Sequence, residues 1–214
     1  MTYRRSTMMH ILLLGATGRV GQRVLARALQ DDHEVTAIVR NMDKISLRSD
    51  RLTLLQGNAC SAGDLSGVMT GVDVVVSCLG TDGGTVLTEA TPLLIAAMKA
   101  ADVSRVVTVG TAGILQSREH PGLLRFEAPD TRRSSTRAAE EHRQAWALLA
   151  ASGLRWTVVC PTYLPDGEAQ GQFRAERDFL PDGGTSISVG DTAAFTYRVA
   201  VEDAYVGCRV GLAY

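Results

Sequence analysis

The sequence has very little lysine, few cysteines and no long apolar run, and each shortage excludes a class of protein. Two lysines, Lys44 and Lys99, stand against twenty arginines, and the net charge is −1, so no overall field attracts nucleic acid or an anionic membrane. The four cysteines form no Cys-x-x-Cys pair, and no histidine lies at metal-ligand spacing. No apolar run approaches the roughly 20 residues that a membrane span needs. We therefore expect a cytoplasmic protein with reduced thiols and no metal, nucleic acid or membrane partner.

The length of 214 residues fits one α/β domain and leaves little room for a second. We expect residues 1–8 to form a flexible tail, because the apolar stretch 11–14 is too short for the core of a signal peptide. Across residues 9–214, apolar runs of strand length alternate with helical patterns. This alternation predicts a single Rossmann domain, an α/β fold in which helices flank a doubly wound parallel sheet.

The expected elements differ in how their apolar residues are spaced. Strands are predicted where apolar residues run together, at residues 10–14, 34–39, 52–56, 73–79, 105–109, 155–160 and 185–189. Helices are predicted where apolar residues recur at helical spacing, at residues 18–29, 61–69, 88–101, 137–151 and 201–212. Pro92 falls in the first turn of its predicted helix, where a missing N–H is tolerated.

The first predicted strand leads through a glycine-rich turn into a helix. Glycine allows a tight turn and close approach of the backbone to a pyrophosphate, and the helix that follows offers free N–H groups and its positive end. A glycine triplet alone is a weak signal, but its place between the first strand and a helix is what the motif requires. The turn thus favours a nicotinamide dinucleotide site over a plain tight turn, and it reads Gly15-Ala16-Thr17-Gly18-Arg19-Val20-Gly21.

An arginine follows the second predicted strand, where an NAD site usually has an aspartate or glutamate that binds the ribose hydroxyls. Arg40 instead suits a 2′-phosphate, which it can bind through a charge-assisted fork. Arg19 lies in the first turn of a helix, where a cation opposes the helix dipole unless an anion is near. Both arginines could simply be solvated, and for Arg19 alone the two interpretations have equal weight. Together they favour NADP(H) over NAD(H).

With these features in place, the chain resembles the atypical short-chain dehydrogenase/reductases. Within them it is most similar to the flavin reductase / biliverdin-IXβ reductase-like NAD(P)-binding family and its NmrA-like relatives. The resemblance implies a Rossmann domain that holds NADPH across the carboxyl ends of its strands and passes hydride to a planar conjugated acceptor. It covers about residues 9–212 and rests on residues 15–21, 39–40, 79–81, 95–100, 105–107, 141–149, 152–154 and 158–161.

The resemblance also implies which residues bind the cofactor. Thr111 matches a serine near the nicotinamide, and residues 161–163 match the segment along its carboxamide side. The chain departs from the pattern at these positions: Tyr163 stands where a histidine is expected, and Thr111 replaces the serine. Asn58-Ala59 replaces the usual Gly-Asp-like end of the third strand, so that an amide must contact the adenine. The implied cofactor contacts are Gly15, Thr17, Gly18, Arg19, Val20, Gly21, Arg40, Asn58, Ala59, Leu79, Gly80, Thr81, Gly110, Thr111, Pro161 and Thr162.

The acceptor side carries fewer signals. We expect the polar, Gly/Pro-rich loop at about residues 163–184 to shape the acceptor site. The chain stops soon after the predicted helix 201–212, where relatives often add an edge strand. The catalytic candidates are Thr111, His142 and Tyr163. His142 shares a helical face with core-type residues, which favours a packed histidine over a catalytic one, and Thr111 could be a plain turn residue.

No tyrosine is followed four residues later by lysine, so the Tyr-x-x-x-Lys pair of classical relatives is absent. Tyr205 and Arg209 have the spacing, but they fall in the predicted terminal helix, far from the site. The absence fits an NADPH-dependent reductase of a flavin, quinone or tetrapyrrole-like acceptor, which needs only hydride and takes its proton from water. A non-catalytic NADP(H)-binding redox sensor fits equally well, and an epimerase or isomerase fits less. We expect a small-molecule partner and a monomer or homodimer.

Overall fold

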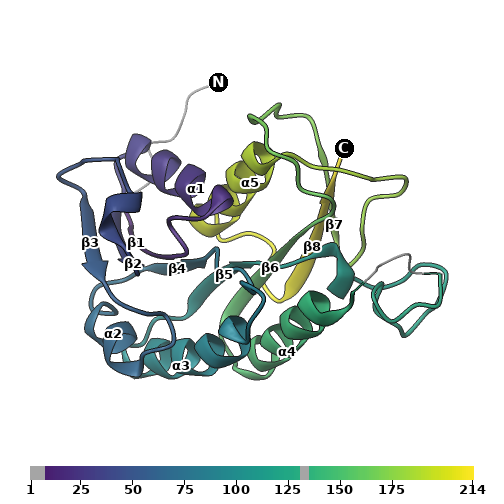
Figure 1. Cartoon of the computed structure of the whole chain (residues 1–214), viewed down its shortest axis with the longest axis horizontal. Coiled ribbons are helices and arrows are strands. Elements are labelled where there is room, and N and C mark those ends of the chain that lie inside the picture. Colours follow the sequence, from purple (N-terminus) through teal and green to yellow (C-terminus); the bar gives the residue numbers. More distant parts are fainter. Residues whose placement is uncertain (1–7, 131–134) are drawn as a thin grey trace.

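The computed structural model describes residues 8–130 and 135–214. The predicted tail, residues 1–8, therefore lies outside the described residues except for Met8. The described chain folds around one eight-stranded sheet (Figure 1), in the order β3-β2-β1-β4-β5-β6-β8-β7. The strands are β1 (His10–Leu14), β2 (Glu34–Val39), β3 (Leu52–Gln56), β4 (Val74–Ser77), β5 (Arg105–Val109), β6 (Arg155–Pro161), β7 (Arg174–Arg177) and β8 (Cys208–Ala213).

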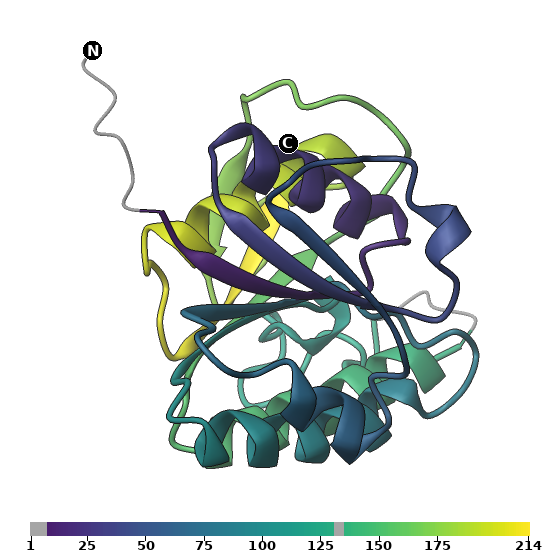
Figure 2. The same ribbon diagram turned by 90° about the vertical axis from the view of Figure 1, so that its left-hand side faces the viewer.

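Two layers of helices cover the sheet, one on each face, as Figure 2 shows. One layer holds α1 (Arg19–Gln30) and α5 (Val189–Val201), and the other holds α2 (Ala62–Gly67), α3 (Val86–Ala100) and α4 (Arg137–Ala151). All neighbouring strands pair in parallel except β7 and β8, which are antiparallel. Strand order reverses between β1 and β4, which is the doubly wound arrangement. The predicted single Rossmann domain is confirmed.

The first strand shows why its continuous apolar run forms a central strand. Ile11 and Leu13 pack on the side of α1 and α5, whereas Leu12 and Leu14 pack on the side of α2, α3 and α4. A strand buried on both faces needs apolar residues at every position rather than at alternate ones.

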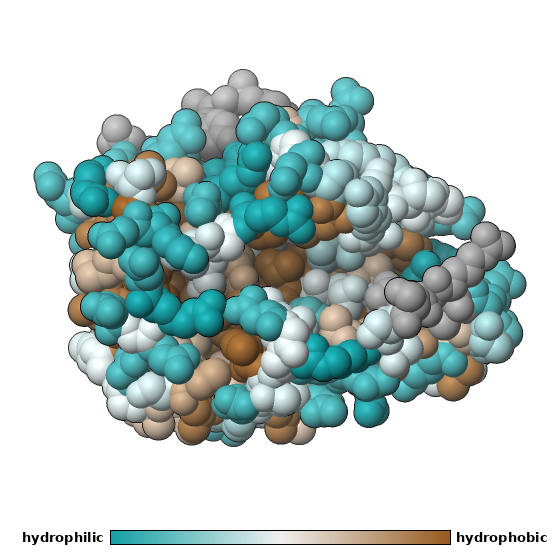
Figure 3. Space-filling model, viewed as in Figure 1, coloured by the Kyte–Doolittle hydropathy of each residue, from teal (hydrophilic) through white to brown (hydrophobic). Residues whose placement is uncertain are grey.

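Hydrophilic side chains border the apolar atoms at the middle of the face in Figure 3. In the described part of the chain, no helix is both long and apolar enough to cross a membrane.

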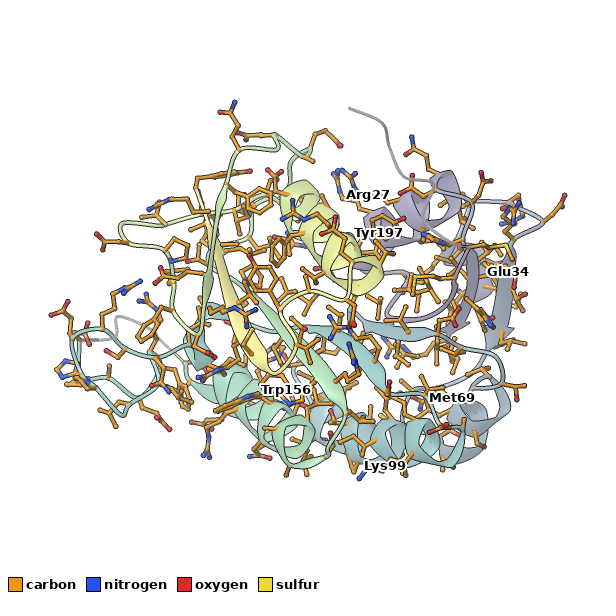
Figure 4. All side chains as sticks on the ribbon, turned by 180° about the vertical axis from the view of Figure 1, so that it is seen from behind. Arg27, Glu34, Met69, Lys99, Trp156 and Tyr197 are labelled. Atoms are coloured by element: carbon orange, nitrogen blue, oxygen red, sulfur yellow. The ribbon has the colours of Figure 1, made fainter. Side chains whose placement is uncertain are left out.

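The layer of α1 and α5 is tied together at one end by a buried tyrosine. Tyr197 of α5 lies next to Arg27 of α1 in Figure 4, and its hydroxyl donates a hydrogen bond to Asp31 at the carboxyl end of α1, at 2.6 Å. The ring is only 7% exposed, so its hydroxyl needs such a partner. The two bonded residues lie 166 positions apart in the sequence, so the contact joins helices from opposite ends of the chain.

The last third of the chain differs from the prediction. The predicted strand 185–189 and the predicted helix 201–212 are both wrong, because α5 begins at Val189 and β8 occupies Cys208–Ala213. Ser188 begins the helix, since its side chain accepts a hydrogen bond from the Asp191 backbone N–H. All six residues of β8 are buried, which a central strand requires and an amphipathic terminal helix would not show.

The sheet also has the edge strand that the sequence was not expected to supply. β7 falls inside the predicted loop 163–184 and pairs with β8, so the predicted lack of an edge strand is wrong. Gly211 helps to explain the error, because a Cβ there would lie 2.1 Å from the Phe179 carbonyl oxygen. Glycine usually weakens a strand pattern, but here a neighbouring backbone passes too close for any side chain.

Two further placements are corrected. Pro92 lies well inside α3 rather than in its first turn, because the helix begins at Val86. A proline there costs about 3 kcal/mol, and the burial of Leu87, Leu94 and Met98 on the same helix offsets that cost. Tyr205 belongs to a turn with φ +57° rather than to a helix.

Candidate functional site

The segments predicted to bind the cofactor meet at one edge of the sheet. The glycine turn follows β1, Arg40 follows β2, Asn58 comes two residues after β3, residues 79–81 come after β4, and Gly110 follows β5. Pro161 is the last residue of β6. Because these strands are parallel, their carboxyl ends share an edge. The strand order reverses between β1 and β4, and doubly wound folds bind their ligands at such a switch point.

Two of the three glycines of the turn, Gly15 and Gly21, leave no room for a side chain. Gly15 has φ +76°, and a Cβ there would lie 2.5 Å from the Cys78 carbonyl oxygen. The Gly18 N–H donates to the Gly15 oxygen at 3.0 Å and closes the turn. At Gly21 a Cβ would lie 2.1 Å from the same Gly15 oxygen. The first turn of α1 therefore packs directly onto the end of β1, and any side chain would separate them.

The amino end of α1 can accept an anion. No side chain in the described structure caps this helix, whose N-cap is Gly18, and its first turn holds no acidic residue. The first N–H groups of a helix have no partner inside the helix, and the helix dipole adds positive potential there. The turn and the helix end therefore fit the pyrophosphate of a dinucleotide.

Both predicted phosphate-binding arginines contact carboxylates of the protein itself. Arg19 Nη1 donates to the Leu164 carbonyl and to Asp166 Oδ1, both at 3.0 Å. Arg40 Nη2 donates to Asp82 Oδ2 at 3.0 Å. Asp166 and Asp82 belong to the loops after β6 and β4, so neither arginine is merely solvated. Asp166 supplies an anion beside Arg19, and a phosphate contact of Arg19 stays a prediction.

At the predicted adenine end, two groups of Asn58 already form hydrogen bonds within the protein. Its Oδ1 accepts from the Cys60 N–H at 3.0 Å, and its backbone N–H donates to Asp64 Oδ2 at 2.8 Å. Ala59, next to it, is buried. An adenine contact from the Asn58 side chain would therefore have to come from its Nδ2 group.

At the predicted nicotinamide end, Thr111 begins a 3-10 turn, η2 (Ala112–Ile114), and its Oγ1 accepts from the Gly113 N–H at 3.3 Å. A hydroxyl that accepts keeps its own hydrogen to donate, so Thr111 can still bind a ligand oxygen. The Thr162 N–H points to the Leu212 carbonyl at 3.4 Å. Tyr163 leaves 72% of its surface exposed at this edge.

His142 lies in α4, and it faces the sheet beneath the ends of β4 and β5. It lines a cavity of about 20 Å³, room for roughly one water molecule. Burial lowers the pKa of His142 to about 4, so its ring is neutral at physiological pH. Thr111 and Tyr163 are not part of the described lining, so this cavity does not unite the three catalytic candidates. Its polar lining residues are Ser77, Thr91, Thr108 and His142.

The burial of His142 predicts a pH dependence of stability. An unfolded histidine titrates near pH 6.5 and the folded one near 4, so between these values the unfolded state binds more protons. We expect the free energy of unfolding to fall by roughly 3 kcal/mol as the pH drops from 6.5 to 4. Urea unfolding of the wild type, His142→Leu and the surface control His120→Gln across this range tests it. A wild-type slope retained in His142→Leu contradicts the assignment.

A buried carboxylate beside His142 carried no sequence signal. Glu141 is 6% exposed, and its Oε1 accepts from the Leu87 backbone N–H in the first turn of α3 at 2.8 Å. A residue of α4 thus caps α3, directly after the loop that follows β4. Arg137 of α4 adds a hydrogen bond to the Gly84 carbonyl in that loop, at 2.8 Å. α4 therefore holds the loop after β4 in place.

A second missed residue fastens the loop after β6. Asp191 is fully buried in the first turn of α5. Its carboxylate accepts from the backbone N–H groups of Gln170 and Gly171 at 3.0 and 2.8 Å, and from the Tyr214 hydroxyl at 2.7 Å. The Ser188-x-x-Asp191 capping pattern was a usable signal for the helix start, but not for the long-range contacts.

This arrangement of a glycine turn and an uncapped helix end at the switch point of the sheet matches what comparison with known families finds. A family model described as NAD(P)H-binding matches residues 15–203. The chain belongs to this NAD(P)H-binding family. The match confirms the resemblance to atypical short-chain dehydrogenase/reductases of the NmrA-like kind, and it supports a nicotinamide cofactor without distinguishing NADP from NAD.

Individual relatives cover nearly the whole chain. The uncharacterized protein YwnB of Bacillus subtilis strain 168 is 28% identical over 203 residues, 91% of each chain. A solved structure from Bacteroides thetaiotaomicron, provisionally named an epimerase, has a TM-score of 0.84 at 25% identity and covers 97% of this chain and 98% of its own. A Streptococcus pneumoniae TIGR4 protein, provisionally named an NADH-flavin reductase, has a TM-score of 0.81 at 24% identity and covers 96% and 99%. The last likeness shows the fold alone.

Proposed function

We propose that the protein is an NADPH-dependent reductase that delivers hydride to a planar conjugated acceptor, such as a flavin, a quinone or a tetrapyrrole. The observation that carries the proposal is the glycine turn under the uncapped amino end of α1, at the switch point of the sheet. Membership of the NAD(P)H-binding family supports the cofactor class. Arg40 after β2 supports the 2′-phosphate.

The cofactor, when bound, supplies the hydride. The residues of this chain bind the cofactor and the acceptor and orient them. The turn residues and the first N–H groups of α1 would hold the pyrophosphate. The Thr111 hydroxyl, which keeps its own hydrogen to donate, would orient the nicotinamide or the acceptor. Such positioning supplies most of the rate when the acceptor takes its proton from water.

No classical proton donor competes with this view in the described structure. Tyr205 precedes β8, and the nearby Gly207 N–H donates to the Trp156 carbonyl at the start of β6. That places Tyr205 at the amino edge of the sheet, opposite the glycine turn. The provisional epimerase name of the Bacteroides relative raises a second chemistry, but an epimerase needs an acid and a base at the substrate. His142 is half-buried and neutral, which makes it a poor candidate for that pair.

The acceptor would rest against the loop after β6. Tyr163 exposes most of its ring there, and an aromatic face suits a flat conjugated molecule. The loop is held to the start of α5 by backbone bonds, from Ile187 N–H to Tyr163, from Val189 N–H to Pro165 and from Gly190 N–H to Gly167, at 3.0 to 3.1 Å. The wall of the proposed acceptor site is therefore formed before a ligand arrives.

A direct assay tests the function. The full chain is mixed with NADPH and then with FMN, FAD, a quinone or biliverdin, while the nicotinamide absorbance band is followed. We expect saturable oxidation with at least one acceptor, unchanged in Thr111→Ser and slowed about 3- to 10-fold in Thr111→Val through the lost hydrogen bond. Thr53→Val on the edge strand β3 is the control. Tight NADPH binding without turnover across the panel would overturn the reductase and favour the redox sensor.

A further inference from the structure

An arginine and an aspartate from different strand ends meet beside the proposed adenosine half of the site. Arg40 follows β2 and Asp82 lies in the loop after β4, and their side chains form an ion pair at 3.0 Å. The other oxygen of the same carboxylate, Asp82 Oδ1, lies 3.8 Å from where a Cβ on Gly80 would stand. The carboxylate thus reaches from the end of β4 toward the end of β2, on either side of β1 in the sheet.

The backbone of the loop fixes where this carboxylate stands. Asp82 has φ +47°, in the left-handed region that aspartate and asparagine tolerate better than most residues. Beyond it, the loop is held from α4 by the Arg137 bond to Gly84 and by the Glu141 bond to Leu87. Asp82 is therefore anchored on one side by the strand end and on the other by a capped helix, although its side chain is half-exposed.

The two charges of the pair favour different cofactors. A guanidinium binds the 2′-phosphate of NADPH, and a neighbouring carboxylate repels that phosphate. NADH has a 2′-hydroxyl instead, and a carboxylate accepts hydrogen bonds from ribose hydroxyls, as the acidic residue after β2 does in NAD-binding relatives of this fold. In this chain the acidic residue is absent from β2 but a carboxylate from another loop stands beside the arginine that replaced it.

We propose that the Arg40–Asp82 pair recognises the 2′ position of both cofactors, Arg40 the phosphate of NADPH and Asp82 the hydroxyl of NADH. Asp82 is then a specificity-determining residue. With NADPH, Arg40 exchanges Asp82 for the 2′-phosphate. With NADH, Asp82 keeps its contact to Arg40 and accepts from the ribose hydroxyls. The chain then uses both cofactors, with a preference for NADPH that Asp82 limits. This inference rests on the proposed function, since it assumes that Arg40 lies at the adenosine ribose.

Removing one charge at a time tests the pair. Dissociation constants for NADPH and NADH are measured with the full chain by fluorescence titration or calorimetry, with no acceptor present. For Asp82→Asn we expect NADPH to bind about 3- to 10-fold more tightly and NADH about 3-fold more weakly, because a repulsion and a charged acceptor are lost together. For Arg40→Gln we expect NADPH to weaken by at least about 10-fold, with little change for NADH.

The matched control is Asp32→Asn. Asp32 also has a left-handed φ, of +63°, and pairs with an arginine, Arg51, at 3.5 Å. It precedes β2 and so lies at the opposite edge of the sheet. We expect this control to leave both constants unchanged, and equal shifts in Asp32→Asn and Asp82→Asn overturn the inference by reducing it to a general charge effect.

The outcomes separate the two proposals. If Arg40→Gln selectively weakens NADPH while Asp82→Asn leaves the NADPH/NADH ratio within twofold of wild type, the role of Asp82 is overturned and the proposed function stands. If Arg40→Gln weakens both nucleotides equally, the 2′-phosphate assignment falls, and the inference falls with it. Opposite shifts of the two nucleotides in Asp82→Asn support the pair as proposed.

Discussion

Gly21→Ala is expected to weaken dinucleotide binding strongly and to destabilise the fold. The new methyl group would stand 2.1 Å from the Gly15 carbonyl oxygen and 2.8 Å from its carbonyl carbon, so α1 must move away from the end of β1. Overpacking of this kind costs about 1–3 kcal/mol, which lowers Tm by roughly 2–12 °C in a chain of this size. A shift of the phosphate-binding N–H groups by about 1 Å weakens function by roughly 100-fold.

The control for this substitution is Gly63→Ala, inside α2. The nearest atom to a Cβ at Gly63 is Ser61 Oγ, 4.0 Å away, so alanine fits, and its higher helix propensity stabilises α2 by about 0.5–1 kcal/mol. Differential scanning calorimetry measures Tm, and titration with NADPH and NADH measures binding. Wild-type nucleotide affinity in a folded Gly21→Ala protein would show that the turn does not hold the pyrophosphate.

Asp191→Ala is expected to loosen the loop after β6. The substitution leaves the Gln170 and Gly171 N–H groups without their acceptor, and it removes the partner of the Tyr214 hydroxyl. Hydrogen bonds to a buried charged group are worth about 1.5–3 kcal/mol, and unpaired buried donors add a cost, so we expect a loss of roughly 2–4 kcal/mol. Thermal unfolding measures the total, and amide hydrogen exchange at Gln170 and Gly171 measures the local effect.

Asp43→Ala, at an exposed aspartate of the 3-10 turn η1 (Met42–Lys44), is the control and should change neither measurement. Amides at Gln170 and Gly171 that stay protected in Asp191→Ala would contradict the anchoring role. The pH dependence gives a second check. Burial opposes ionisation of Asp191, but the hydrogen bonds from the loop N–H groups, Tyr214 and Ser188 outweigh it and hold the pKa of the carboxyl below its usual 3.8.

A carboxyl whose folded pKa is lowered contributes stability above the unfolded pKa and loses it as the pH falls through the folded value. Asp191 therefore adds to stability above about pH 4 and contributes less with further acidification. His142 has its effect at higher pH, between 6.5 and 4. In that range its lowered pKa makes the free energy of unfolding fall as the pH drops. The wild type should therefore lose stability in two successive ranges of pH, and Asp191→Asn should lack only the lower one.

Periodicity alone was enough for the first two thirds of the fold. β1, β2, β3, β5 and α4 have the predicted bounds, because continuous apolar runs and helical spacing are properties that a residue carries locally. The glycine turn was recognisable for the same reason, since three glycines between a strand and a helix have a local cause. The edge at which the strand ends meet then follows from parallel pairing.

The remaining third depended on contacts between distant segments. Gly211 is required by the Phe179 backbone, which lies more than thirty residues earlier in the chain, so no local pattern marks β8 as a strand. Asp82 and Asp166 are polar loop residues of an ordinary kind, and only the folded chain places them against Arg40 and Arg19. Side chains that act through long-range pairing have no period to detect.

The fastened loop after β6 has a thermodynamic consequence for ligand binding. Ordering a residue's backbone costs about 1–2 kcal/mol. When a loop becomes ordered only around its ligand, this cost reduces the binding free energy of the ligand for each residue that is ordered. Here the bonds from residues 163–171 to the start of α5 form during folding, so the entropy has already been lost when an acceptor arrives. Even an acceptor with few contacts can then bind, and its selection depends on the shape of a preformed surface.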